Sequence, residues 1–250
     1  MEKKRIFLTG AAGSLGTSIR IRLRTRYDFR LLLHATVPDD LHPEDQVVMG
    51  SVADDTAMVE AGSGVDAIVH LAIRRWRGMK PEDVAKATFE VDIPGVYNIL
   101  EAARINEVPV VVFASTNHVT GLYEKEGLVS TPESPVRPDG VYGAGKAFGE
   151  AVGRFYAERH GIRVICLRVA NFNGEDGPGR QYEPGYSRWL SPGDLAQLVW
   201  RSIELEHVKF GIFYGVSGGS DKKWDLSNAR EMLGYVPKDD GTLPEYGGNE

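Results

Sequence analysis

Thr9-Gly10-Ala11-Ala12-Gly13-Ser14-Leu15-Gly16 is the stretch that decides the fold of this chain. It follows the apolar run Arg5 to Thr9, which predicts a short strand, and Leu15, Ile19 and Leu23 then recur at helical spacing. Glycines between a strand and a helix leave the backbone amides at the helix N-terminus open to a phosphate group. The stretch therefore predicts a dinucleotide-binding loop near the start of an α/β domain.

Strands and helices alternate along the chain beyond this loop. Apolar runs predict strands at 29–33, 67–71, 108–114 and 162–169, and helical periodicity predicts helices at 54–61, 81–106 and 141–160. Pro94 lies inside the second of these helices and lacks a backbone N–H donor, so we expect that helix to be broken into two pieces. The alternation predicts an α/β fold, a single-domain Rossmann-like doubly wound parallel sheet.

The C-terminal third shows no such alternation beyond residue 170. The segment 173–193 is rich in glycine and proline and predicts a loop, and Ser191 is placed to cap a helix that runs to Glu206. We therefore expect residues 171–236 to form a small substrate-side extension, with 237–250 as a loose tail. At 250 residues the chain is long enough for one domain, 1–250, and too short for a sizeable second one.

The composition excludes several classes of protein. A net charge of −6 disfavours a general nucleic-acid-binding surface. The single cysteine, Cys166, lies in an apolar run, so an intrachain disulfide is impossible and we expect a buried structural thiol. The chain starts with charged residues and has no apolar stretch of about 20 residues, the length that a membrane span needs. We expect a cytoplasmic protein with no membrane or nucleic-acid partner and no metal.

Tyr142 and Lys146 form a candidate catalytic pair, because residues four positions apart at the start of a helix share one face. A tyrosine with a pKa near ~10 is a poor base at neutral pH, but an adjacent ammonium stabilises its phenolate and makes it a usable general base. The preceding strand ends in Ser115-Thr116-Asn117-His118, at the edge where a parallel sheet presents side chains to a ligand. These residues predict removal of a proton from an alcohol, with hydride transfer to the dinucleotide.

The end of the second strand leaves the choice of dinucleotide open. NAD-specific sites usually carry an acidic residue there, which binds the ribose diol. This chain has Leu33-His34-Ala35 at that place, and no arginine follows to hold a 2′-phosphate. Both NAD and NADP are therefore candidate cofactors.

Together these motifs resemble the extended short-chain dehydrogenase/reductase superfamily. The resemblance rests on the glycine loop, on Val69-His70-Leu71-Ala72, on the Ser115-Thr116 pair and on the spacing of Tyr142 and Lys146. Residues 113–118 and 137–143 are similar to uronate dehydrogenases, and 189–191 and 229–235 to haloarchaeal NAD-dependent glucose-6-phosphate dehydrogenases. The resemblance covers nearly the whole chain and implies oxidation of the anomeric carbon of an aldose, uronate or sugar phosphate to a lactone.

The resemblance also implies roles for individual residues. It makes Thr116, Tyr142 and Lys146 catalytic, with Tyr142 as the base that takes the hydroxyl proton. The cofactor-binding positions that it implies are Gly10, Gly13, Ser14, Leu15, Gly16, His34, Ser51, Val52, Leu71, Ala72, Ile73 and Lys146. The substrate-binding positions are Arg75, Thr116, Asn117, His118, Tyr142, Asn171 and Arg180. Relatives in the superfamily commonly assemble, so we expect a homo-oligomer.

Three features of the sequence depart from the pattern of the family. Asp92 replaces an asparagine that often supports the active-site lysine, and Ser51-Val52 replaces an aspartate-hydrophobic pair beside the adenine. Pro184 stands near the place of the arginine that binds the substrate carboxylate in uronate dehydrogenases, which puts a uronate substrate in question. Other arginines are candidates for an anion site: Arg74, Arg75, Arg77, Arg180 and Arg188. If they face the pocket, a carboxylated or phosphorylated sugar is favoured over a neutral one.

Two other functions stay open at this point. A nucleotide-sugar epimerase or dehydratase uses the same core but retains its cofactor, and such enzymes usually have a larger C-terminal domain than the residues after 169 provide here. A non-catalytic dinucleotide-binding protein would not need Thr116, Tyr142 and Lys146 together. Net reduction of the cofactor by a simple sugar separates the dehydrogenase from the epimerase or dehydratase.

Overall fold

Seven parallel strands form one sheet in the computed structural model, which describes residues 2–74, 78–179, 187–219 and 223–246. The strands are β1 (Lys4–Thr9), β2 (Tyr27–Leu33), β3 (Gln46–Met49), β4 (Ala67–His70), β5 (Val110–Thr116), β6 (Arg163–Val169) and β7 (Phe210–Gly215). Their order across the sheet is β3-β2-β1-β4-β5-β6-β7, and every neighbouring pair is parallel.

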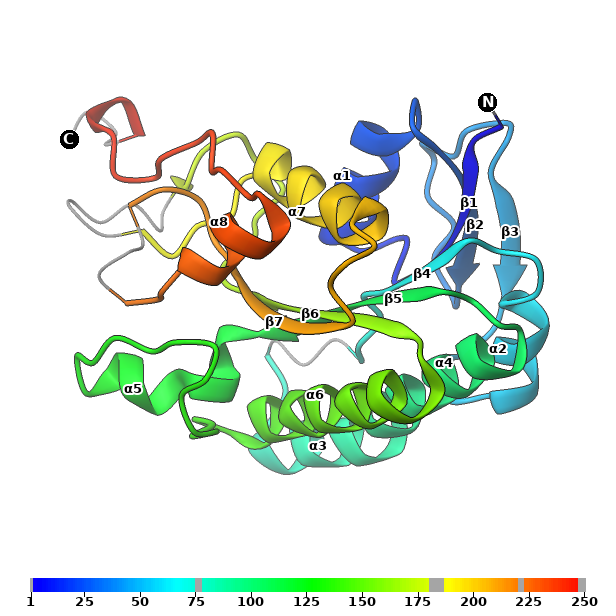
Figure 1. Ribbon diagram of the computed structural model, residues 1–250, viewed down its shortest axis with the longest axis horizontal. Coiled ribbons are helices and arrows are strands. Elements are labelled where there is room, and N and C mark those ends of the chain that lie inside the picture. The colour runs from blue at the N-terminus through cyan, green and yellow to red at the C-terminus, as the bar shows by residue number, and fades with distance from the viewer. Residues whose placement is uncertain (1, 75–77, 180–186, 220–222, 247–250) are drawn as a thin grey trace.

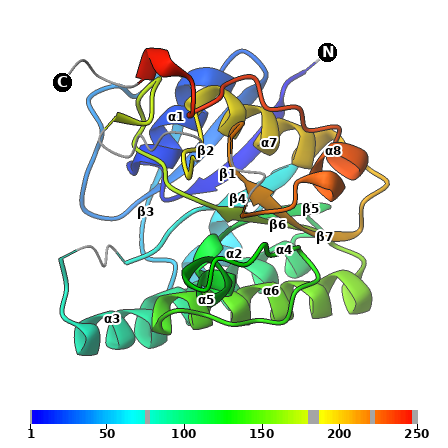
Figure 2. The same ribbon diagram turned by 90° about the vertical axis from the view of Figure 1, so that its left-hand side faces the viewer.

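Helices cover both faces of this sheet. They are α1 (Ser14–Leu23), α2 (Asp55–Ala61), α3 (Pro81–Ala87), α4 (Ile93–Ile105), α5 (Gly121–Lys125), α6 (Val141–His160), α7 (Pro192–Glu204) and α8 (Ser227–Leu233), with the short turns η1 (Thr88–Asp92), η2 (Asn117–Thr120) and η4 (Pro244–Tyr246). Helices α1, α7 and α8 lie on one face, and α2, α3, α4 and α6 lie on the other (Figures 1 and 2). The predicted Rossmann-like, doubly wound α/β fold is confirmed.

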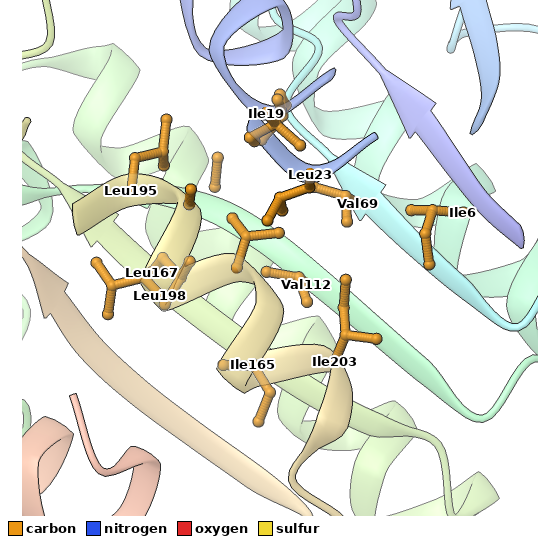
Figure 3. Packing of buried hydrophobic residues seen from close by; sticks show 14 of the residues in the cluster. Ile6, Ile19, Leu23, Val69, Val112, Ile165, Leu167, Leu195, Leu198 and Ile203 are labelled. Atoms are coloured by element: carbon orange, nitrogen blue, oxygen red, sulfur yellow. The ribbon is translucent and has the colours of Figure 1, made fainter. Parts of the chain in front are cut away.

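Two hydrophobic cores lie on opposite faces of the sheet, because side chains alternate along each central strand. In β1, Leu8 packs in the core beneath α1 and α7, whereas Phe7 packs in the core beneath α2, α4 and α6. In β5, Val112 packs in the first of these cores and Val111 in the second. Figure 3 shows the first core, between the sheet and helices α1 and α7. Burial on both faces explains why these strands are continuous apolar runs in the sequence.

Helix α6 approaches the sheet so closely that no side chain fits at Gly149. A methyl group there would lie 2.5 Å from Cζ of Phe113 on β5, and Phe113 is itself buried. Glycine therefore sets the distance between this helix and the sheet. The close approach brings Lys146, one turn earlier in α6, to the carboxyl end of β5.

The predicted break in the helical stretch 81–106 is confirmed at Pro94. Helix α3 ends at Ala87, the π-helical turn η1 follows, and α4 starts at Ile93. Pro94 has no N–H to donate to the carbonyl of Glu90, four residues earlier. The wider π-helical turn accommodates the missing hydrogen bond.

The prediction that the alternation ends near residue 170 is wrong. Helix α7 covers the sheet, and β7 pairs with β6 as the seventh strand. Helix α7 does start as predicted, because Ser191 Oγ accepts a hydrogen bond from the N–H of Asp194 at 3.0 Å. The long connection 170–191 conceals the continuation, since connections in α/β units usually have about 2–6 residues. Sequence periodicity also gives no sign of the edge strand β3, which is short and mostly exposed.

The C-terminal tail is anchored over its described part, 237–246, so the prediction of a loose tail does not hold there. Asp194, buried on α7, accepts hydrogen bonds from the backbone N–H groups of Lys238 at 2.8 Å and Asp239 at 3.3 Å. Ser191 Oγ donates to Asp239 Oδ2 at 2.5 Å. The first turn of α7 thus holds the tail through side-chain contacts that periodicity does not reveal.

Among the described residues, none of the helices has the length and apolar character that crossing a bilayer requires. Within the same residues, no three His, Cys, Asp or Glu side chains are grouped so that they could hold a metal ion.

We predict that Gly149→Ala lowers the free energy of unfolding by about 1–3 kcal/mol, because the new methyl group overpacks the contact with Phe113. The same change in a helix without such a contact stabilises by about 0.5–1 kcal/mol. Gly193→Ala in α7 is the matched control, because the added methyl group meets only ordinary contacts there, at 3.5 Å or more. Urea unfolding of both variants measures the difference, and equal stabilities would contradict the packing described for α6.

Candidate active site

The predicted site residues that the structure describes gather at one edge of the sheet. All strands are parallel, so their carboxyl ends meet there, and the strand order reverses between β1 and β4, where doubly wound sheets bind their ligands. In order of strand, these residues are the glycine loop after β1, His34 after β2, Ser51 and Val52 after β3, 71–73 after β4, Thr116, Asn117 and His118 at the end of β5, and Asn171 after β6.

The glycine loop forms a cradle for a phosphate group. Gly10 has a φ of +69°, and a side chain there would lie 2.9 Å from the N atom of Ala72. Helix α1 begins at Ser14 with Gly13 as its cap, and no described side chain makes the capping hydrogen bond. The first amides of α1 are thus left for an anionic ligand, which is the arrangement that a pyrophosphate requires. The residues of this loop therefore fit a dinucleotide.

Thr9 and His70 join the ends of β1 and β4 beneath that cradle. The hydroxyl of Thr9 lies 2.8 Å from His70 Nδ1 and accepts hydrogen bonds from the N–H groups of Leu71 and Ala72, both at 3.2 Å. His70 is buried, and its ring stacks on that of Phe113. Burial, with a smaller effect of the Lys146 charge, lowers the pKa of His70 to about 3. The imidazole is therefore neutral at physiological pH. Because Thr9 Oγ1 already accepts hydrogen bonds from two backbone N–H groups, its own hydroxyl is placed to donate a hydrogen bond to Nδ1.

Arg20 ties the glycine loop to the segment after β2. Its side chain is buried, Nε donates to the carbonyl oxygen of Ala11 at 3.1 Å, and Nη2 donates to Asp40 Oδ1 at 2.8 Å. The hydrogen bond from Arg20 is the main cause that lowers the pKa of the Asp40 carboxyl. Because both loops belong to the predicted dinucleotide site, this arginine fixes their relative position.

Lys146 is buried beside Tyr142 at the carboxyl end of β5. Its Nζ donates to the carbonyl oxygen of Ala114 at 2.7 Å and lies 4.7 Å from the ring centroid of Phe113 and 5.9 Å from that of Tyr142. Burial lowers the pKa of Lys146 to about 8, with an opposing effect of the Asp92 carboxylate. The side chain therefore carries its charge at neutral pH, close to the ring of Tyr142.

The turn η2 presents the polar residues that follow β5. Thr116 Oγ1 caps the turn by accepting a hydrogen bond from the N–H of His118 at 3.3 Å. The Nδ1 atom of His118 lies 2.9 Å from Asp139 Oδ1, and the His118 ring contacts that of Tyr142 edge to face, with centroids 6.1 Å apart. When His118 donates a hydrogen bond from Nδ1 to this carboxylate, Nε2 is the second hydrogen-bonding atom of its ring. A side chain at Gly143 would collide with the His118 carbonyl, so this glycine brings α6 against the turn.

The structure limits the candidates for an anion site. Arg188 is already paired with Glu124, with 2.5 Å between Nε and Oε1. Asp92 Oδ1 accepts a hydrogen bond from the backbone N–H of Arg74 at 2.8 Å, and burial raises the pKa of Asp92. Arg75, Arg77, Arg180 and Pro184 lie outside the described residues.

The remaining predicted positions differ in their surroundings. His34 is exposed, whereas the Val52 side chain is packed in the core against Gly95 of α4. Asn171 pairs through its backbone with the segment at Trp189. The Val52 carbonyl oxygen accepts a hydrogen bond from Asn98 Nδ2 at 3.0 Å, and the Val52 side chain packs against Gly95, so both already contact α4.

The sequence patterns assigned no role to His70, Arg20 or Asp139. These residues support the site through contacts with Thr9, the glycine loop and His118, respectively. The chain holds a signal for Asp139, an acidic residue three positions before the candidate tyrosine. No such signal exists for Arg20, because an arginine on a helix is ordinarily exposed. Its role depends on the loop 34–45 folding back over α1.

The chain belongs to the NAD dependent epimerase/dehydratase family, whose model matches residues 6–201. It is 36% identical over 236 residues to a uronate dehydrogenase of Pseudomonas putida, which covers 94% of this chain and 84% of the relative. It is 33% identical over 250 residues to an NAD-dependent glucose-6-phosphate dehydrogenase of Haloferax volcanii, covering 94% and 93%.

A solved structure shows the same fold. The uronate dehydrogenase from Agrobacterium tumefaciens, as a mutant complexed with NAD, has a TM-score of 0.81 and 29% sequence identity, over 98% of this chain and 88% of that one. The predicted resemblance to the extended short-chain dehydrogenase/reductase superfamily, and to these two groups within it, is confirmed.

We predict that His70 makes the fold sensitive to acid. The unfolded chain takes up a proton at His70 near its ordinary pKa of 6.5, whereas the folded protein does so only near 3. Acid therefore favours the unfolded chain across this window, and stability falls as the pH decreases. Between pH 6.5 and 4.5, the free energy of unfolding of His70→Gln should therefore fall by about 2 kcal/mol less than that of the wild type.

Urea unfolding of wild type and variant at these two pH values measures the difference. His34→Gln, a change at an exposed strand end, is the control and should keep the wild-type dependence. An unchanged dependence in His70→Gln would contradict a buried neutral imidazole at this position.

Proposed function

We propose that this protein is an NAD-dependent sugar dehydrogenase, which oxidises the C1 hydroxyl of an aldose, uronate or sugar phosphate to a lactone. The observation that carries the proposal is the buried Lys146 beside Tyr142, close to Thr116 and on the sheet edge that holds the glycine loop. The uronate and glucose-6-phosphate dehydrogenases, each matched over 94% of this chain, support the same reaction.

NAD is the cofactor that we propose. The glycine loop 9–16 would hold its pyrophosphate, His34 and Ser51 would lie near its adenosine half, and 71–73 and Lys146 would contact the nicotinamide half. The Haloferax relative is named NAD-dependent, and the Agrobacterium structure contains NAD. When bound, NAD supplies the hydride acceptor for the reaction.

In the proposed reaction, the side chains of the protein accept one proton and bind the sugar. Tyr142, as phenolate, takes the proton of the C1 hydroxyl, and the Lys146 ammonium stabilises that phenolate. The Thr116 hydroxyl binds the same substrate oxygen, while Asn117 and His118 bind neighbouring ring hydroxyls. Asn171 lies at the next strand end and completes the proposed sugar side of the site.

Two observations disfavour the alternatives. An epimerase or dehydratase must hold a nucleotide attached to the sugar, and here α7, β7 and the anchored tail use much of the chain after β6 for the domain itself. A non-catalytic binding protein gives no reason to bury a lysine ammonium beside a tyrosine, which burial alone opposes.

The charge of the sugar forms a separate part of the proposal. Arg188 is paired with Glu124. Among the other candidate arginines, we propose Arg75 and Arg180 for binding a carboxylate or phosphate group. If only neutral aldoses react, this part of the proposal is wrong and the rest stands. We propose a cytoplasmic location as well, since that compartment supplies NAD and sugar phosphates.

We further propose that two copies associate through the outer faces of α4 and α6. These faces expose large apolar side chains, namely Tyr97, Ile105, Val141, Phe148 and Phe155. Val141, Phe148 and Phe155 recur every seven residues, so they form one stripe along α6. Both signs of charge flank the stripe, in the pairs Arg104–Glu101 and Arg154–Glu158, which suits a symmetric contact.

Light scattering tests this association. We expect a mass of at least twice 27.5 kDa for the wild type and a monomer for Phe155→Glu. Ile21→Glu, at an equally exposed apolar position on α1, should leave the assembly unchanged. A monomeric wild type would contradict the proposed interface.

We predict that Tyr142→Phe lowers kcat at least about 100-fold and leaves dinucleotide affinity nearly unchanged, because only the proton acceptor is lost. Absorbance at 340 nm measures turnover for NAD and NADP against neutral aldoses, uronates and sugar phosphates, and calorimetry measures dinucleotide binding. Tyr27→Phe, a change far from the sheet edge that holds the site, should keep turnover. Retained turnover in Tyr142→Phe would overturn the assigned base.

A further inference from the structure

A buried ion pair lies behind the sugar side of the site, between α6 and β6. Arg168 donates through Nε to Glu150 Oε1 at 2.9 Å and through Nη2 to Oε2 at 2.8 Å, and both side chains are buried. Ser115 on β5 donates to the same carboxylate at 2.6 Å. Removing either charge would leave the other buried without its partner, which is strongly destabilising. The pair therefore fixes the position of α6 relative to β6.

The hydroxyl of Tyr214 connects this ion pair to segments near the site. Arg168 Nη1 donates to Tyr214 OH at 3.2 Å, and the Tyr214 ring on β7 is fully buried. The same hydroxyl lies 2.7 Å from Thr120 Oγ1 and 2.9 Å from Ser130 Oγ. One phenol oxygen thus joins the ion pair to two segments outside the sheet.

Both of these segments carry residues of the proposed sugar side. Thr120 ends the turn η2, and its hydroxyl also donates to the carbonyl oxygen of Asn117 at 3.3 Å. Ser130 belongs to the segment that leads to Asp139, the partner of His118. On the proposed cofactor side, Arg20 holds the glycine loop at Ala11, and Thr9 holds Leu71 and Ala72.

We propose that Tyr214 is a positioning residue for the sugar, which acts by holding η2 and the segment around Ser130 at a fixed place relative to the sheet. It does not touch the substrate. The inference rests on the proposed function, since it assigns the sugar to Asn117 and His118. It also separates the two halves of the site, because the Tyr214 hydroxyl serves the sugar half alone.

Tyr214→Phe tests the proposal, because it keeps the ring and removes only the hydroxyl. We expect the KM of the sugar to rise about tenfold and the dissociation constant of NAD to change less than twofold. Tyr235→Phe is the matched control: Tyr235 is equally buried, and its hydroxyl donates to the carbonyl oxygen of Val216 at 2.7 Å, away from η2. A purely structural role would lower the melting temperature of both variants and leave both sugar KM values near that of wild type.

Thr120→Val interrupts the same link from its other end and keeps the side-chain volume. We expect it to raise the sugar KM as Tyr214→Phe does, and the double variant to raise it no further, because both changes break one connection. Effects that multiply in the double variant would contradict a shared link. If Tyr214→Phe does not fold, Thr120→Val and its comparison with Tyr235→Phe decide the proposal.

Hydrogen exchange provides a readout that does not depend on turnover. Amides in peptides that cover 117–140 should exchange about tenfold faster in Tyr214→Phe than in Tyr235→Phe, while peptides that cover 9–20 stay as in wild type. If the wild type oxidises no sugar, the proposed function fails, and exchange alone then decides whether Tyr214 holds this segment. Equal exchange in the two variants, or an unchanged sugar KM in an active Tyr214→Phe, would overturn the inference.

Discussion

The buried ammonium of Lys146 is the constraint on which the rest of the site depends. Burial lowers its pKa to about 8, and the Asp92 carboxylate is the largest opposing effect. The ammonium donates a hydrogen bond to the Ala114 carbonyl oxygen and lies over the Phe113 ring. Those contacts exist because Gly149 lets α6 lie against β5. The chemistry proposed for Tyr142 therefore depends on the packing distance between one helix and one strand.

Separate hydrogen-bond networks hold the strand ends around this lysine. Thr9 and His70 join β1 to β4 beneath the glycine loop, and Arg20 fixes that loop against the segment after β2. On the other side of Lys146, Tyr214 connects the buried pair of α6 and β6 to η2. The proposed dinucleotide side and the proposed sugar side are thus held by different hydrogen-bond networks.

Most of the fold could be predicted, because buried parallel strands appear in the sequence as apolar runs and amphipathic helices as helical periodicity. The glycine loop also identifies the connection between β1 and α1. The strand β7 could not be predicted, since a long connection, 170–191, precedes the last helix and strand, and the exposed edge strand β3 has only three consecutive apolar residues, 47–49. In the site, Tyr142, Lys146 and Thr116 could be predicted from local spacing and strand ends. Arg20 and Tyr214 could not, because each acts through contacts between segments far apart in the sequence.

The central claim is that hydride leaves C1 of a sugar and remains on the dinucleotide at the end of the reaction. A sugar carrying deuterium at C1 tests this most directly, with the wild-type protein, excess NAD and mass spectrometry of both products. The account predicts deuterium on the reduced nicotinamide, one label per lactone formed. Sugar that is epimerised or dehydrated, with its label retained and no reduced dinucleotide released, would contradict it.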